Sequence, residues 1–523
     1  MKRKTLLFSI ALGIIFDILF WQKAQGISFF IFTLVLLGFA AILVRGIDLP
    51  FQKKGYFFLV PISFFAILSF VHTEPLTAFL NRALVLVMIG IWAARFSSGN
   101  WERLGLIDYL IYALRIVWTM ISVPWLRADK TGLFPQNVEG QKPGIKSILR
   151  GILLAIPVLF LFSLLFASAD LAFAEGIENI LQYLRIEQLD EHFARMLLIF
   201  LTANAFLGLI LISARKSEND RLVGEEEPFI QPFLSSVESG IVLSSVLLLF
   251  FTFIILQFRY FFFNQTAIAE FGFSYSEYAR RGFGELIAVS VISLALILSL
   301  SAVTKVSKER EKHLLSWMYT GLAAGNLVIL VSAFMRLSLY ESAYGFTRLR
   351  TYSHVFIIWL GLLLVAVSVI IWKNKTRLFA NVLLAMAIGF SATLNLLNPD
   401  AFIVRQNVKR TAGNETLDSP YLASLSSDAV PTLVDLFNIP GQSAEIKRDI
   451  GVAILCYQST HNKDETQNHW QSFTISGFRA ERYLTSVADQ LKDFSVTTAE
   501  DQTFVILDDL GRETYCIDTF FLD

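Results

Sequence analysis

The sequence has little charge, almost no cysteine and no net charge. Only 17% of its 523 residues are charged, against about 25% in an ordinary soluble domain. Lysine plus arginine and aspartate plus glutamate both number 44, so the basic excess typical of a nucleic-acid-binding protein is missing. Two cysteines, Cys456 and Cys516, are too few for a disulfide scaffold or a cysteine-rich metal site. The composition therefore argues against a soluble domain, a nucleic-acid-binding protein, a disulfide scaffold and a cysteine-rich metal site.

Several common enzyme motifs are also absent. The chain has no G-x-x-x-x-G-K-[ST] phosphate loop, no strand-linked G-x-G-x-x-G, no G-x-S-x-G and no H-E-x-x-H. Its six histidines are scattered, and none has a second histidine or a cysteine three or four residues away. We therefore predict no catalytic motif residue, no metal ligand and no cofactor. Nucleotide-driven pumps and zinc peptidases are disfavoured.

What the sequence has instead is long apolar runs, with 54% hydrophobic residues and 48 phenylalanines. A hydrocarbon core about 30 Å thick takes roughly 20 apolar residues of helix, because lipid offers no partner for an open backbone. We predict an all-α polytopic membrane bundle over residues 1–397, with about eleven transmembrane helices. They lie near 5–21, 27–44, 56–71, 77–94, 148–168, 193–214, 237–258, 284–303, 316–337, 353–372 and 378–397.

Two further apolar segments within this region read as helices that do not span. In residues 104–126 the polar side chains recur at steps of four and three, which places them on one face of a helix. They are Asp108, Tyr112, Arg115, Thr119 and Ser122. We place this helix in the plane of the cytoplasmic interface, because a span here would move every later basic loop outside. A second amphipathic helix is expected at the outer face near 170–187.

Charge position predicts the orientation. Lys and Arg concentrate in alternate loops, which places the N-terminus on the cytoplasmic side. The expected location is the bacterial plasma (inner) membrane. Residues 398–523 then form a small extracytoplasmic α+β domain, with amphipathic helices near 419–437, 443–460 and 478–492 and a final β-hairpin that turns at Gly511. This segment holds 10 basic and 19 acidic residues, which leaves 34 and 25 for residues 1–397. The neutral total thus conceals a basic inner side and an acidic outer one.

Two ionisable residues lie at matching depth inside predicted spans, Asp17 in the first and Arg82 in the fourth. Such groups are costly in lipid and usually pair, so we predict an Asp17–Arg82 pair, either as a tie between helices or in a substrate or proton role. The outer loop with His72, Glu74 and Pro75 is expected to be a solvated turn, with a proton relay as the alternative. For Cys456 and Cys516, a disulfide and two unpaired thiols both remain open.

Arginines at the outer face run against the positive-inside bias and call for an explanation. They form a candidate outer cluster with acidic residues and one histidine. Its members are Arg280, Arg281, Glu285, Arg336, Glu341, Arg348, Arg350, His354, Asp400 and Arg405. One interpretation is that ion pairs dock the outer domain on the bundle. The other is a site for an anionic lipid headgroup or a glycan carrier.

Several blocks of this sequence resemble a known family. They are FDILFWQKAQGISFFIF (16–32), FSYSEYARRGFGEL (273–286), RLSLYESAYGFTRLRTY (336–352), NPDAFIVRQNVKR (398–410) and LDSPYLASLSSDAVPTL (417–433). In the same order along the chain, they resemble the bacterial family called domain of unknown function 4173, with its relative 4153. The resemblance implies a multi-pass protein of the bacterial envelope and no assigned activity.

Three functions are consistent with these observations. The first is a non-enzymatic sensing, scaffolding or regulatory protein acting through its outer domain. The second is a transporter of a small or lipid-linked anion. The third is an outer-leaflet transferase, for which Glu285, Glu341, Asp400 and His354 are the residues that can supply a base. The expected partners are the lipid bilayer and either an anionic headgroup or an envelope protein, without nucleic acid.

Overall fold

The structure is a computed structural model, and most of the residues that it describes are helical. It describes residues 2–47, 53–96, 101–126, 189–213, 231–262, 283–411, 417–461, 469–498, 503–508 and 510–516, and single positions between 155 and 176. Seven helices in this part are long and apolar enough to cross a membrane, and three shorter apolar helices accompany them. The length and apolar composition of these helices therefore indicate a membrane protein. The predicted span 148–168, the outer helix 170–187 and the residues Arg280 and Arg281 lie almost entirely outside the described residues.

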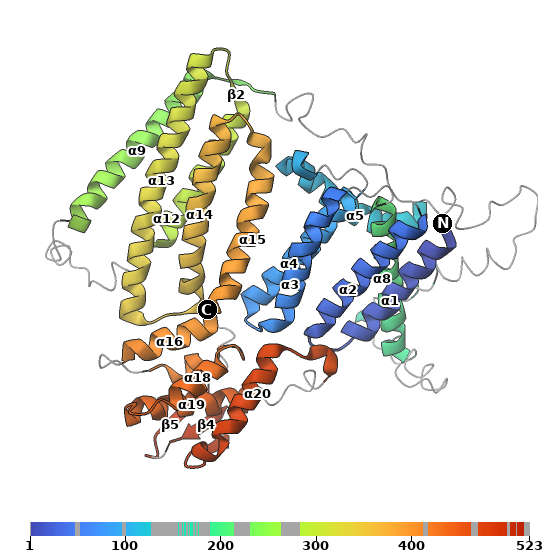
Figure 1. Cartoon of the computed structure of the whole chain (residues 1–523), viewed down its shortest axis with the longest axis vertical. Helices are drawn as coiled ribbons and strands as arrows, with labels where there is room; N and C mark the ends of the chain where they lie inside the picture. The colour runs from blue at the N-terminus through green and yellow to red at the C-terminus, as the bar shows by residue number, and fades with distance from the viewer. Residues whose placement is uncertain are drawn as a thin grey trace, which may run out of the picture.

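The first group of helices comes from the N-terminal part of the chain (Figure 1). It contains α1 (Lys2–Phe20), α2 (Ile27–Ile47), α3 (Leu59–Val71), α4 (Pro75–Ala94), α5 (Leu106–Leu126) and α8 (Leu189–Ser213), with the short 3-10 turns η1 (Lys53–Phe58) and η2 (Trp101–Arg103). Helix α1 packs on α8 and α2, and α3 packs on α4. Phe58, Phe65 and Met88 lie in the buried core between α3 and α4.

The second group lies beside the first and comes from the middle of the chain (Figure 1). It contains α9 (Ser236–Phe262), α12 (Phe283–Val303), α13 (Glu309–Tyr344), α14 (Arg348–Trp372) and α15 (Phe379–Leu397), with the 3-10 turn η3 (Thr376–Leu378). The two-residue strands β1 (Leu234–Ser235) and β2 (Thr304–Lys305) pair in parallel at one end. Helix α13 packs on α9, α12 and α14 around one apolar core.

A reciprocal amide pair joins the two groups in the apolar region. Asn81 of α4 donates to Asn395 Oδ1 of α15 at 2.9 Å, and Asn395 donates back to Asn81 Oδ1 at 2.8 Å. The Ser391 hydroxyl also donates to Asn81 Oδ1 at 3.2 Å. Buried amides are retained in an apolar setting only when they find partners. This pair therefore fixes α4 against α15.

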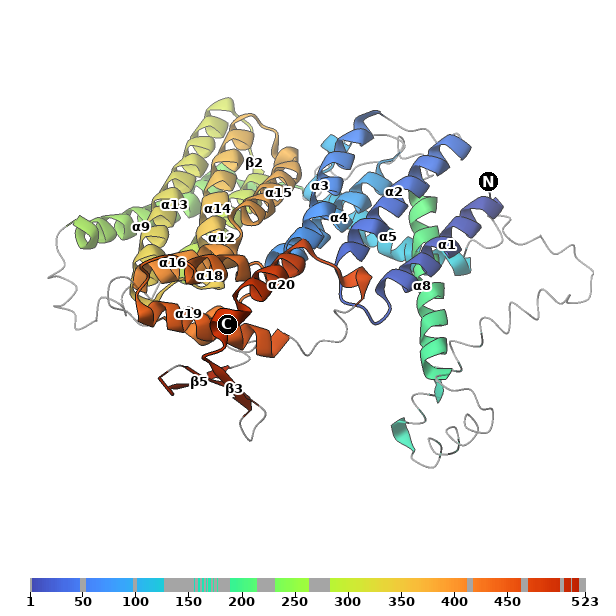
Figure 2. The ribbon, with the colours of Figure 1, turned by 60° about the horizontal axis from the view of Figure 1, so that its bottom comes forward.

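The two ends of the bundle differ. At the docked end, which is where α1 and α15 finish and α4 and α14 begin, the C-terminal residues cover the helices (Figures 1 and 2). Helix α5 lies at the opposite end. Its Tyr109 hydroxyl donates to Asn381 at the start of α15 at 2.8 Å, Arg95 at the end of α4 lies 5.0 Å from the Tyr112 ring centroid, and Met120 touches Gly208 of α8. Helix α5 thus meets α15, α4 and α8 in turn near their ends.

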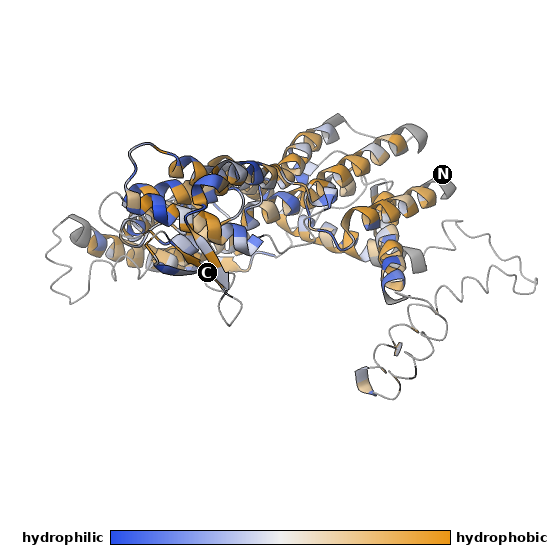
Figure 3. Cartoon of the chain, turned by 90° about the horizontal axis from the view of Figure 1, so that it is seen from below, coloured by the Kyte–Doolittle hydropathy of each residue, from blue (hydrophilic) through white to orange (hydrophobic). Residues whose placement is uncertain are grey.

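The C-terminal assembly, which we define as residues 399–516, has its own hydrophobic core. Its helices are α16 (Pro399–Thr411), α17 (Ser419–Ala423), α18 (Val430–Phe437), α19 (Ala444–His461) and α20 (Ile475–Val487), with the 3-10 turns η5 (Trp470–Ser472) and η6 (Ala488–Leu491). The chain turns from α15 into α16 at Asn398, which has a left-handed backbone with φ 49°, and Pro399 then starts the new helix. In Figure 3 this assembly is far more hydrophilic than the helices of the bundle.

A three-stranded antiparallel sheet ends the described chain, in the order β3 (Ser495–Thr498), β4 (Phe504–Leu507) and β5 (Glu513–Cys516). Strands β4 and β5 form the expected hairpin, with Phe504 opposite Cys516 and Gly511 at φ 75° in the turn. Strand β3 is an addition that the sequence analysis did not predict. Cys516 is bonded to Cys456 of α19, with Cα atoms 5.3 Å apart, so the two cysteines are not free thiols. The bond joins the sheet to the helical core.

Candidate functional site

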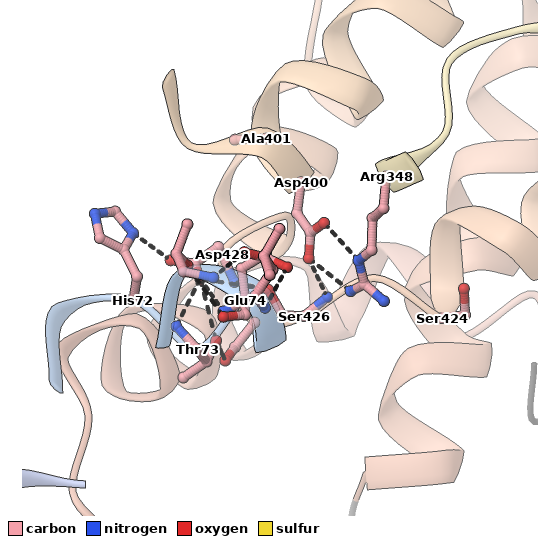
Figure 4. A network of polar contacts seen from close by, with 12 residues as sticks. His72, Thr73, Glu74, Arg348, Asp400, Ala401, Ser424, Ser426 and Asp428 are labelled. Atoms are coloured by element: carbon pink, nitrogen blue, oxygen red, sulfur yellow. Dashed lines mark hydrogen bonds and ion pairs between the residues drawn. The ribbon is translucent and has the colours of Figure 1, made fainter. Parts of the chain in front are cut away.

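Three buried carboxylates of the docked end belong to one network, hereafter the docking network, shown in Figure 4. It joins four segments of the chain: the loop between α3 and α4, the first turn of α14, the first turn of α16, and the loop before α18. Its three carboxylates are almost inaccessible, since the exposed fractions are 1% for Glu74, 0% for Asp400 and 6% for Asp428. Burying ionised groups is costly unless each is paired and hydrogen-bonded. The partners of each carboxylate therefore decide what the network does.

Glu74 is the N-cap of α4. Its carboxylate accepts hydrogen bonds from the Leu76 amide at 2.9 Å and the Thr77 amide at 2.7 Å, with Pro75 in the first helical position. Negative charge is favourable at this end of a helix. The Tyr352 hydroxyl of α14 donates to the same carboxylate. The expectation of a solvated turn at this loop is therefore wrong, because the C-terminal assembly and α14 cover it.

Asp400 and Arg348 form a two-pronged ion pair. Arg348 Nε donates to Asp400 Oδ1 at 2.9 Å, and Arg348 Nη2 donates to Asp400 Oδ2 at 2.7 Å. The Ser426 amide donates to Asp400 Oδ2 at 2.7 Å as well. Paired hydrogen bonds from a guanidinium are the strongest kind of ion pair in proteins. This contact links the start of α14, the start of α16 and the loop before α18.

Asp428 reaches across to the other helix group. It accepts hydrogen bonds from the Thr73 amide at 2.7 Å and the Glu74 amide at 2.9 Å, and it pairs with His72 Nδ1 at 3.0 Å. Burial alone raises the pKa of Asp428, but the hydrogen bond and charge of His72 and the Thr73 amide outweigh it, so the pKa lies below its ordinary value of 3.8. The ionised form of Asp428 is therefore the one that holds the loop.

Acid is expected to weaken this contact. Since the pKa of Asp428 is lowered in the folded protein, its ionisation contributes stability that is present above pH 3.8 and is lost as the pH falls through the folded value. The midpoint of thermal unfolding should therefore drop between about pH 5 and pH 3, and less in Asp428→Asn. The measurement is a thermal melt of the full chain in lipid nanodiscs at each pH. An equal drop in both proteins would contradict this role.

A second buried group lies on α13 and α14. His354 Nδ1 is 3.3 Å from Glu341 Oε1, and His354 Nε2 is 3.1 Å from the Ser338 hydroxyl. The Phe334 ring packs edge-on against the imidazole, with centroids 4.4 Å apart. The Ser338 hydroxyl also donates to the Phe334 carbonyl of its own helix at 2.9 Å. A hydroxyl, an imidazole and a carboxylate thus lie in one row, although Glu341 Oε1 makes no hydrogen bond there.

The turn between α13 and α14 is held by a third group. Arg350 donates to the Gly345 carbonyl, and its guanidinium lies 4.0 Å from the Tyr340 ring centroid. Asn407 of α16 accepts from the Phe346 amide at 2.7 Å and donates to the Phe346 carbonyl at 2.9 Å. Gly345 has φ 83°, and a Cβ there would lie 2.9 Å from Asn407 Oδ1, so only glycine fits. Helix α16 is thus bonded to this turn.

The predicted outer cluster is therefore divided among separate contacts. Arg348 meets Asp400, Glu341 meets His354, and Arg350 belongs to the turn. Glu285 is exposed on α12, Arg336 is half-buried on α13, and Arg405 is exposed and donates to the Ala401 carbonyl of its own helix. Within the described residues, no group of three or more histidine, cysteine or acidic side chains is placed to hold a metal ion.

The predicted Asp17–Arg82 pair is wrong. Arg195 of α8 donates to both oxygens of Asp17, with the shortest distance 2.6 Å from Nη2 to Oδ2. Arg82 donates instead to the Gln25 carbonyl at 3.1 Å. The reason is packing, since α1 lies against α8, and Trp21 Nε1 extends the same contact to Glu191 at 3.0 Å. Matched depth in the sequence does not tell which helices are neighbours.

A double-mutant cycle is expected to distinguish the two arginines. Asp17→Asn combined with Arg195→Gln should show a coupling free energy of about 1 kcal/mol, because the two side chains are joined directly by hydrogen bonds. Asp17→Asn combined with Arg82→Gln should be additive within about 0.5 kcal/mol. The quantity measured is the free energy of unfolding in lipid nanodiscs. Equal coupling for the two pairs would refute the observed pairing.

The residues that sequence reasoning missed are His72 to Glu74 and their partner Asp428. Two signals were present. A glutamate followed directly by proline marks a helix start, which places the Glu74 carboxylate on backbone amides and not in water. The run Ser426-Ser427-Asp428 has the composition of a hydrogen-bonding loop. Neither signal predicts that the loop at 72–74 contacts the loop at 426–428.

Comparison with known proteins agrees with the resemblance noted in the sequence. The family model described as Domain of unknown function (DUF4153) matches residues 59–436, which is well over half of the chain. This range contains every residue of the docking network, from His72 to Asp428. The match is to the relative named second above and not to family 4173. No curated protein and no solved structure matches the chain. The chain therefore belongs to the DUF4153 family.

Proposed function

We propose that this protein is a multi-pass protein of the bacterial plasma membrane that acts as an envelope sensor or scaffold through an outer C-terminal domain. About eleven transmembrane helices would carry this domain at their outer ends, with the N-terminus in the cytoplasm. The observation that carries the proposal is the docking network. Its three carboxylates are hydrogen-bonded and almost closed to solvent, and Arg348 is paired with Asp400, which suits a permanent attachment of the domain better than a ligand site.

Two features support the orientation. Exposed basic residues gather at the opposite end of the second helix group, among them Lys305, Lys308, Arg310, Lys373 and Lys375, as expected for a cytoplasmic face. The docked end carries the Cys456–Cys516 disulfide, and such bonds persist in oxidising compartments outside the cytoplasm. The position of α5 across the ends of α15, α4 and α8 supports an in-plane cytoplasmic helix.

The polar residues inside the helices favour a scaffold over a transporter. Asn204 and Asn326 donate to carbonyls of their own helices, and Asn381 and Asn395 tie one helix to another. A transport path needs polar groups that face a passage reached from both sides. These amides are used in packing instead.

The proposal is tested by co-purification from cross-linked cells. A scaffold should lose its envelope partners when Arg348→Met releases the C-terminal assembly, and should keep them in the control Arg405→Met, which changes an exposed arginine of α16. Equal recovery of partners with both variants would contradict the proposal. The orientation is tested with a membrane-impermeant maleimide on intact cells, which should label Leu510→Cys and leave Lys375→Cys unlabelled.

One observation favours a second candidate, an outer-leaflet acyl transferase. Ser338, His354 and Glu341 lie in one row, so a Ser338 hydroxyl turned away from the Phe334 carbonyl would give its proton to His354 Nε2 while its oxygen attacks an ester carbonyl. The acyl group would pass to Ser338, and the alcohol would leave with the proton held by His354. A water or a second alcohol would then accept the acyl group.

A fluorophosphonate probe tests this candidate. It should label the wild-type chain and lose its target in Ser338→Ala, while Ser342→Ala, an exposed serine one turn further along α13, should label normally. Absence of labelling in the wild type, or equal labelling of both variants, would contradict a catalytic Ser338. The sensor or scaffold role would then be the one function that the described geometry supports.

A further inference from the structure

A short segment of the C-terminal assembly lies at the level where helices α1 and α2 end. The Phe473 carbonyl accepts a hydrogen bond from the Ile27 amide at 2.8 Å, and Gln471 Nε2 donates to the Ile18 carbonyl at 3.3 Å. The approach is close, since a Cβ on Gly26 would lie 2.5 Å from the Phe473 carbonyl oxygen. These contacts hold residues 469–482 at the level of the turn between the two helices (Figure 2).

This segment exposes large aromatic side chains. The exposed fractions are 59% for Trp470, 41% for Phe473 and 50% for Phe478, and the rings of Phe473 and Phe478 lie 6.0 Å apart. Tryptophan and phenylalanine bury more apolar area than almost any other side chain when they are covered. Three of them exposed within nine residues indicate a surface that is covered in the working protein.

The neighbouring surface of α1 tells what covers it. Leu7, Ile10, Ile14 and Ile18 are exposed at spacings of three and four residues, so they form one apolar strip along α1. In a helix that crosses a membrane, such a strip faces lipid. It ends at Ile18, the residue whose carbonyl accepts the bond from Gln471, next to Trp470. The aromatic patch therefore adjoins the lipid-facing strip of α1 at the depth of the headgroups, where tryptophan is enriched.

The charge of the segment fits an anionic surface. Arg479 and Arg482 are both exposed, and the Arg482 guanidinium lies 6.0 Å from the Phe478 ring centroid. Residues 469–482 hold these two arginines and one glutamate, Glu481, whereas residues 398–523 as a whole hold 10 basic and 19 acidic residues. The segment is thus locally basic in an acidic part of the chain. Arginine is well suited to bind the phosphate of a lipid headgroup.

We propose that residues 469–482 form a lipid-binding surface that inserts Trp470, Phe473 and Phe478 into the outer leaflet and binds headgroup phosphates through Arg479 and Arg482. This inference rests on the proposed outer position of the C-terminal assembly. Through this surface the outer domain binds the lipids of the outer leaflet, in addition to docking on the helices. Its arginines give it a preference for anionic phospholipid.

Environment-sensitive labelling of the full chain tests the insertion. A fluorescent maleimide of the NBD type is attached to Trp470→Cys or Phe478→Cys in proteoliposomes, with Leu510→Cys on the exposed β4–β5 turn as the matched control. The native cysteines are bonded and do not react. Headgroup-depth spin-labelled lipids should quench the two anchor positions at least about twofold and leave the control unquenched. Equal quenching of anchor and control positions would overturn the proposal.

Lipid composition tests the arginines. Quenching at Trp470→Cys should rise when phosphatidylcholine vesicles are supplemented with phosphatidylglycerol, and Arg479→Gln with Arg482→Gln should abolish that rise while the protein stays docked. The same quenching in both vesicles with the native arginines would overturn the phosphate part of the proposal. Docking is followed separately by hydrogen exchange of the Ser426 amide, which bonds to Asp400. A protected Ser426 amide with an unquenched Trp470→Cys probe refutes only the membrane insertion of residues 469–482. An unprotected amide refutes the docking of the C-terminal assembly.

Discussion

Replacing Arg348 with methionine is expected to release the C-terminal assembly from the bundle. Asp400 is completely buried, and Arg348 is the cation that pairs with it through two hydrogen bonds. Removing one partner of a buried ion pair leaves an uncompensated charge and costs about 3–5 kcal/mol. Hydrogen exchange of the Ser426 amide, which donates to Asp400, should accelerate roughly a hundredfold or more.

Two further variants separate the ion pair from general damage. Arg348→Met combined with Asp400→Leu should recover most of the lost stability, because an apolar pair of similar volume is often neutral in place of a buried ion pair. Arg405→Met removes an exposed arginine from the same helix as Asp400 and should change stability by less than about 0.5 kcal/mol. If Arg348→Met behaved like Arg405→Met, the ion pair would have no part in docking.

Loss of the disulfide is the other large effect that we expect. Cys456 and Cys516 close a loop of 60 residues, and in the chain-entropy model such a bond contributes about 4 kcal/mol to the stability of the folded state. Both sulfurs belong to the core of the C-terminal assembly, where they join α19 to β5. The variant Cys456→Ala with Cys516→Ala should therefore unfold this assembly at lower denaturant concentration, while the bundle keeps its helical signal.

Reduction of the wild-type protein provides the matched comparison. A reductant should lower the unfolding midpoint of the wild type to near that of the double alanine variant, and should leave the variant unchanged. Unchanged mobility and mass after reduction and alkylation of the denatured wild type would show that the bond does not form. Equal stability of oxidised and reduced wild type would contradict its contribution to the fold.

The helices are the part of the structure that the sequence predicts well. The expected spans 237–258 and 378–397 correspond to α9 (Ser236–Phe262) and α15 (Phe379–Leu397). Such spans are predictable because a segment's own apolar residues decide whether it can cross a membrane as a helix. Helix α13 shows the limit of this reasoning. It runs from Glu309 to Tyr344, whereas 316–337 was expected. Charged residues end a hydrophobic run, but they do not end a helix that continues into water or into a protein contact.

The contacts between segments are the part that the sequence did not predict. Asp17 and Arg82 have the right depth and charge, yet the partner of Asp17 is Arg195, since α1 packs on α8. Glu74 and Asp428 each look like ordinary loop residues, and their burial comes from the meeting of two loops more than 350 residues apart. Strand β3 is short, polar and exposed, so it has no alternating pattern, and its pairing depends on β4.

The central claim is that the C-terminal assembly lies outside the cytoplasm and is docked on the loop between α3 and α4. A cysteine pair tests it most directly, because the Thr73 and Ser427 hydroxyl oxygens are 2.7 Å apart. In cells whose free thiols are blocked before lysis, Thr73→Cys with Ser427→Cys is predicted to form a second disulfide beside the native Cys456–Cys516 bond. A chain with the native bond formed and the engineered pair reduced would contradict docking, and a chain with both pairs reduced would contradict the outer location.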